Sequence, residues 1–145
     1  MPLRLLYFSR DDIEGMVPAA FILQALDDDG DGVEDAGMWD TVSKNACDEA
    51  DAACSSMFTV PFAEPVPVLV AQTAQSIMAA SLYRRRAIED AKNPYAKEAA
   101  EKTSKLTRIC QKEESVPKDF PVAVNSVSAI TERAKTSSTG GFLCA

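Results

Sequence analysis

The sequence predicts a mainly α-helical protein, a small bundle of about four to five helices with an extended C-terminal arm. Three observations lead to this prediction. Apolar residues recur at steps of three and four over much of residues 10–112, prolines and glycines interrupt this spacing, and the spacing stops near residue 114. A chain of 145 residues is long enough for one core. We therefore expect a helical domain over residues 1–114 and an arm over residues 115–145.

The first two helices are expected to be short. Ser9 stands before Arg10, Asp11 and Asp12, which matches a helix N-cap followed by acids in the first turn, where the helix dipole favours negative charge. We expect this helix to cover residues 10–16. Pro18 suits the first position of a second helix, which ends before the aspartate-rich segment that follows Leu26.

Two longer helices are expected next. The first should cover residues 36–57, because apolar residues recur along one face, at Trp39, Val42, Ala46, Ala50, Ala53 and Met57. Prolines at positions 61, 65 and 67 then require an extended connection. From about Pro65 to Asp90 the apolar spacing predicts a long helix, which is the best candidate for the centre of the core.

A last helix is expected after the break at Asn93 and Pro94. Its apolar positions run from Tyr95 to Cys110, and lysines and glutamates occupy much of the remaining face. We therefore expect a half-solvated helix over residues 95–112.

The arm over residues 115–145 has too little apolar surface for a core of its own. Two interpretations remain open. The arm is a frayed tail, or it orders against a neighbouring subunit by strand addition or by docking of Phe142 and Leu143. Phe120 is a further candidate for such an interface.

Cysteine and histidine usage argues against several classes of site. The four cysteines form no CxxC pair, and the chain has no histidine, so neither a zinc site nor a disulfide scaffold is expected. Cys47 and Cys54 are seven residues apart, which places both on one helical face as small buried thiols. Without histidine the commonest general base is missing, and no phosphate-binding loop or catalytic motif is present. We expect a protein that is not an enzyme and has no cofactor.

Membrane insertion is not expected either. The longest apolar run, near Val66 to Ala71, is far shorter than a bilayer span, and residues 1–9 lack a signal-peptide cleavage site. We expect a soluble protein that is not exported.

Charge is divided unevenly along the chain. Residues 1–64 carry three basic and fourteen acidic side chains, whereas residues 65–145 carry twelve basic and eight acidic ones. This division has two interpretations: it reflects only solvated faces, or the two surfaces meet in a head-to-tail contact between identical subunits, which can close into a ring.

The segment from Asp27 to Asp35, DDDGDGVED, resembles the start of an EF-hand calcium loop. Carboxylates at Asp27, Asp29, Asp31 and Asp35, with the backbone carbonyl of Val33, would supply oxygen ligands. The twelfth position holds Met38 in place of a bidentate glutamate, which would weaken any binding. The sequence allows a turn whose aspartates cap the next helix, or a weak calcium site.

The arginines Arg84, Arg85 and Arg86 stand at the end of the long helix, where the dipole favours cations. They either neutralise this helix end or contact an acidic partner, such as the acidic half of a neighbouring copy. Base-specific binding to nucleic acid is not expected, because no aromatic residues alternate with this cluster in an acidic chain.

The order of these features resembles the head-to-tail connector (adaptor, or head completion) family of tailed bacteriophages. The resemblance rests on SRDDIEGMV, the DxDGDGVxD loop, DEADAAC, VPFAEPVP and the helix ending in LYRRR. It covers roughly Leu5 to Glu114 and is strongest for the Mu-like branch of head completion proteins.

The resemblance implies a protein without an active site that is made in the host cytoplasm and located in the virion neck, at the head-tail interface. Such a protein forms a ring, twelve-fold by the resemblance, that binds the portal protein on one side and a tail, stopper or terminator protein on the other. DNA passes through the ring without sequence-specific binding. The alternative function is a small cation-binding regulatory protein that uses the loop from Asp27 to Asp35.

Overall fold

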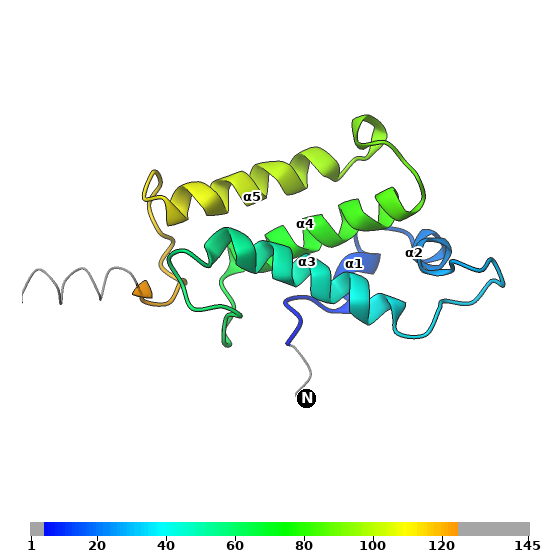
Figure 1. Cartoon of the computed structure of the whole chain (residues 1–145), viewed down its shortest axis with the longest axis horizontal. Coiled ribbons are helices and arrows are strands. Elements are labelled where there is room, and N and C mark those ends of the chain that lie inside the picture. Colours follow the sequence, from blue (N-terminus) through cyan, green and yellow to red (C-terminus); the bar gives the residue numbers. More distant parts are fainter. Residues whose placement is uncertain (1–4, 125–145) are drawn as a thin grey trace, which may run out of the picture.

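The computed structural model describes residues 5–124, and all the regular elements in this range are helices. They are α1 (Arg10–Glu14), α2 (Ala19–Leu26), α3 (Met38–Cys54), α4 (Val68–Arg85), the 3-10 helix η1 (Asp90–Lys92) and α5 (Ala96–Cys110). The three long helices lie side by side, with α1 and α2 towards one end (Figure 1). The predicted mainly α bundle is confirmed. Among the described residues, no helix is long and apolar enough to span a membrane.

Helix α4 is the centre of the bundle, as predicted. It packs against α1, α2, α3 and α5. Its buried residues occur around the whole helix: Val70, Thr73, Ala74, Ser76, Ile77, Met78, Ala79, Ala80 and Leu82. The small side chains among them allow neighbouring helices to approach closely, so the helix can be surrounded on several sides. The helix begins after Pro67 and ends at Arg85, so it is shorter than the predicted range of residues 65–90.

The ends of the other helices follow local capping chemistry. Ser9 accepts a hydrogen bond from the Asp12 N–H and the Asp12 carboxylate accepts one from the Ser9 N–H, which completes a capping box at the start of α1. Helix α1 ends at Glu14, two residues before its predicted end. Pro18 is the N-cap of α2 and not its first residue.

Helix α3 is also shorter than predicted. Gly37 precedes it with a φ of 76°, a left-handed conformation that favours glycine, and the helix ends at Cys54. The backbone N–H groups of Met57 and Phe58 then donate to the Cys54 carbonyl, forming a turn that buries both side chains. Cys47 and Cys54 are buried, as predicted.

Residues 115–124 fold back onto the bundle. Phe120 is 9% exposed and packs against Phe58 and Phe62, with ring centroids 5.2 and 6.1 Å away. The Val124 N–H donates to the Met57 carbonyl at 2.9 Å. The arm therefore does not start at residue 115, and Phe120, predicted as an interface residue, lies in the core of its own chain. The remainder of the predicted arm, with Phe142 and Leu143, lies outside the described residues.

A buried hydrogen-bonded link ties this end of the core to the N-terminal segment. The Tyr7 hydroxyl donates to the Asp51 carboxylate at 2.6 Å and accepts from the Phe62 N–H at 2.8 Å. One hydroxyl thus connects the N-terminal segment, α3 and the proline-rich turn.

Candidate functional site

The aspartate-rich segment forms a closed loop between α2 and α3. The Asp35 N–H donates to the Leu26 carbonyl at 2.9 Å, which joins the two ends of the loop. Gly30 and Gly32 have φ values of 77° and 86°, so the tight turn uses backbone conformations that glycine adopts without strain.

Asp27 organises the inside of this loop. Its Oδ1 accepts hydrogen bonds from the Gly30 and Asp31 N–H groups at 2.8 and 3.2 Å, and its Oδ2 accepts one from Gly32 at 2.8 Å. The hydrogen bond from Gly32 is the main cause of a lowered pKa at Asp27. The Asp27 carboxylate therefore stays ionised and sets the loop conformation. The aspartates do not cap the next helix, which the sequence had allowed, because the N-cap of α3 is Gly37 and no side chain of the described residues makes a capping hydrogen bond there.

Three of the predicted metal-ligating carboxylates come together. Asp27, Asp29 and Asp35 each place one oxygen within 4.8 Å of the other two. A hydrogen bond from the Asp31 N–H lowers the pKa of Asp29, but contact with the Asp27 carboxylate, desolvation and the neighbouring charges outweigh it, and the pKa is raised. The cluster therefore carries like charges that a proton or a cation would relieve.

Asp31, a further predicted ligand, does not join this cluster. The Asp31 carboxylate accepts from the Val33 N–H at 2.8 Å and is not part of the group of three. The Val33 side chain is exposed, and Met38, at the twelfth position, packs against the hydrophobic core. Three converging carboxylates are fewer ligands than a complete EF-hand provides, and calcium binding stays a prediction.

The arginines at the end of α4 bind groups of their own chain. Arg84 donates to Asp90 at 2.8 Å, and this hydrogen bond is the main cause of the lowered pKa of Asp90. Arg85 donates to the Ala25 carbonyl at 2.7 Å and to the Asp28 carboxylate at 2.5 Å. These contacts attach η1, α2 and the aspartate loop to the end of α4.

Arg86 completes this arrangement. It donates to the Gln24 side chain, and its guanidinium lies 5.2 Å from the centre of the Phe21 ring. All three arginines stay exposed to solvent. Contact between their exposed surface and an acidic partner therefore stays a prediction. The sequence did not predict that the aspartate loop and the arginine cluster would meet, because Asp28 and Arg85 are 57 positions apart.

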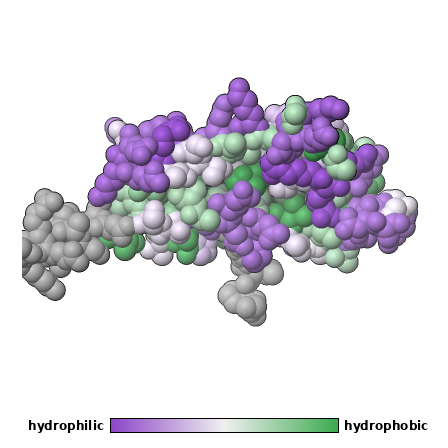
Figure 2. Space-filling view, turned by 45° about the horizontal axis from the view of Figure 1, so that its top comes forward, coloured by the Kyte–Doolittle hydropathy of each residue, from purple (hydrophilic) through white to green (hydrophobic). Residues whose placement is uncertain are grey.

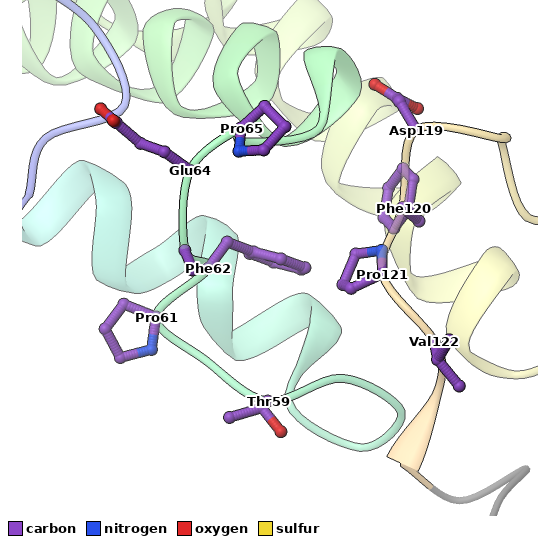
Figure 3. A pocket seen from close by; sticks show the side chains of 10 residues that line it. Thr59, Pro61, Phe62, Glu64, Pro65, Asp119, Phe120, Pro121 and Val122 are labelled. Carbon is purple, nitrogen blue, oxygen red and sulfur yellow. The ribbon is translucent and has the colours of Figure 1, made fainter.

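A groove that the sequence analysis missed lies at the opposite end of α4. It has a volume of about 410 Å³ and runs between the proline-rich turn before α4 and the chain around Phe120 (Figure 3). We call it the proline groove, defined by Pro61, Phe62, Pro65, Phe120, Pro121 and Val122. The paired prolines and phenylalanines of VPFAEP and DFPV were its only signal in the sequence, and such short signals do not show that two segments meet.

Comparison with known proteins places the chain in a bacteriophage family. No curated protein and no solved structure matches the chain. A family model described as "Bacteriophage Mu, Gp36" matches residues 7–128, which is most of the sequence. The match confirms the Mu-like part of the resemblance, while the connector role is a matter for proposal. The chain therefore belongs to the bacteriophage Mu Gp36 family.

Proposed function

We propose that this protein is a structural component of the virion neck. It forms a ring that joins the capsid portal to the tail and continues the DNA channel. Its partners are further copies of itself, the portal protein, and a tail, stopper or terminator protein. We also propose that it acts without catalysis, which the absence of histidine from the whole sequence supports.

Family membership over residues 7–128 is the observation that carries this proposal. It establishes a phage protein, and the order of motifs resembles head-to-tail connectors in particular. The helical bundle of the described residues agrees with the fold that this resemblance implies.

The charged surfaces offer a way for copies to meet. Asp11 on α1 and Asp40 on α3 are exposed, and so is Lys105 on α5; none of the three forms an ion pair within residues 5–124. Figure 2 shows one face on which hydrophilic residues cover much of the surface. An acidic surface of one copy against a basic surface of the next makes a heterologous contact, the kind that closes rings.

Reversal of one lysine tests this contact. The variant Lys105→Glu is co-expressed with the portal protein of the same genome, and the bound amount is measured by affinity purification and native mass spectrometry. Lys44→Glu makes the same charge change within the acidic half, where the exposed Lys44 pairs with Asp48. We expect Lys105→Glu to reduce the copies bound per portal and Lys44→Glu to leave them unchanged. Equal binding by both variants and by the natural sequence would contradict the charge-based contact.

The convergence of Asp27, Asp29 and Asp35 favours a second candidate function, weak cation binding. Calcium titration of the full chain, followed by thermal unfolding, tests it. A bound cation raises the melting temperature as its concentration passes the dissociation constant, and Asp29→Asn should remove this rise. Asp40→Asn, an exposed acid outside the loop, is the matched control. An equal response from both variants would attribute the effect to general screening of charge.

A further inference from the structure

The proline groove presents apolar surface that no described residue covers. Its floor consists of the Phe62 and Phe120 rings, which are 3% and 9% exposed and meet edge to face at 6.1 Å. Pro61, Pro65 and Pro121 form its exposed walls. Figure 3 shows the two chain segments facing each other across the groove.

Exposed valines extend this apolar surface beyond the groove. Val122 lines the groove and is 78% exposed, Val68 is 60% exposed, and Val124 is 46% exposed. Val68 lies at the same place, because its N–H donates to the Asp119 carboxylate at 2.7 Å. In Figure 2 hydrophobic surface borders the place where the described chain ends. A patch of this kind marks a site where another segment or molecule binds.

The prolines determine which kind of segment fits. A proline has no backbone N–H, so three of the residues that line the groove cannot donate to an added strand. Strand addition, one of the two modes considered for the arm, is therefore disfavoured here. Insertion of apolar side chains between the proline rings and above the two phenylalanines suits the groove better.

The chain itself supplies such side chains. The sequence continues for 21 residues after Val124, which lies beside the groove. Within these residues Phe142 and Leu143 are the one adjacent pair of large apolar residues, and the small polar residues 136–141 precede them.

The length of the sequence between Val124 and Phe142 favours docking within one chain. Phe142 is 18 positions beyond Val124, and 18 residues span at most about 60–65 Å, so the chain is long enough to bring Phe142 back to the groove. A tether of this kind gives an effective concentration on the order of millimolar. Charge also favours the encounter, because Glu64 and Asp119 line the groove and residues 125–141 carry Arg133 and Lys135 against one acid, Glu132.

We propose that Phe142 and Leu143 dock into the proline groove of their own chain. The docked pair covers the Phe62 and Phe120 rings and part of the valine surface. The inference goes beyond the neck-ring proposal and does not depend on it.

Disulfide trapping tests the docking, because Cys144 follows the apolar pair directly. In the full chain, Ala63→Cys places a thiol in the groove, and Glu101→Cys places one on the exposed face of α5. Each variant is oxidised in a glutathione redox buffer at several protein concentrations. Peptide mapping identifies the bonds formed with Cys144, and circular dichroism confirms folding.

If the pair docks, the disulfide between Cys144 and the cysteine at position 63 should form at least about tenfold faster than the disulfide between Cys144 and the cysteine at position 101 on α5. The rate should not depend on protein concentration. Phe142→Ser with Leu143→Ser in the Ala63→Cys chain should reduce it to the α5 level, which separates docking from simple nearness along the chain. An unchanged rate in that triple variant would overturn the proposal, and so would a bond that forms only between two chains.

Discussion

Replacement of Phe120 by alanine tests how residues 115–124 belong to the fold. Burial of a phenylalanine contributes about 1.5–3 kcal/mol, and each aromatic pair adds about 0.5–1.5 kcal/mol. Phe120 is 9% exposed and pairs with two rings, Phe58 and Phe62. Because the neighbouring groups can relax into the open groove, we expect Phe120→Ala to cost about 3 kcal/mol, near the lower end for such substitutions.

Urea unfolding followed by circular dichroism measures this cost. Val122→Ala is the matched control, because Val122 is two residues away and 78% exposed, so its loss should change the free energy of unfolding by less than about 0.5 kcal/mol. A cost below about 0.5 kcal/mol for Phe120→Ala as well would refute the reasoning. Residues 115–124 would then be a tail that contributes nothing to the core.

Three further predictions concern the N-terminal part of the chain. Ser9→Ala removes the capping hydroxyl of α1 and should cost about 1 kcal/mol in the same assay. Tyr7→Phe removes the hydroxyl that bonds Asp51 inside the core and should cost about 1–3 kcal/mol, measured by thermal and urea unfolding. The Arg10 guanidinium lowers the pKa of Glu34 from 4.5, so the stability that this pair contributes is present above pH 4.5 and is lost as the pH falls through the folded pKa. Unfolding of Glu34→Gln between pH 3 and pH 7 should therefore depend less on pH, and an unchanged dependence would contradict this.

Local patterns in the sequence predicted the helices well. The cap at Ser9, the helix start near Pro18 and the apolar spacing of α4 depend on residues a few positions apart. The first two mark real helix starts to within one residue, and the third marks a real helix. The predicted C-terminal end of α3 was wrong by three residues. The turn at Met57 and Phe58 is set by burial of both side chains, which the helical spacing does not encode.

Contacts between distant segments could not be predicted in the same way. Phe120 was assigned to an arm because prolines surround it, and only the fold shows that Phe58 and Phe62 lie opposite. Arg85 and Asp28 likewise meet because α2 packs against α4. At the candidate metal site, three aspartates converge as the motif suggested, whereas Asp31 instead accepts a local backbone hydrogen bond.

The neck-ring proposal is tested most directly by electron microscopy of the full chain co-expressed and co-purified with the portal protein of the same genome. The account predicts a second annular layer on the portal, made of copies of this chain around a continuous channel. Portal rings that remain bare at low salt, with both proteins abundant and folded, would contradict it.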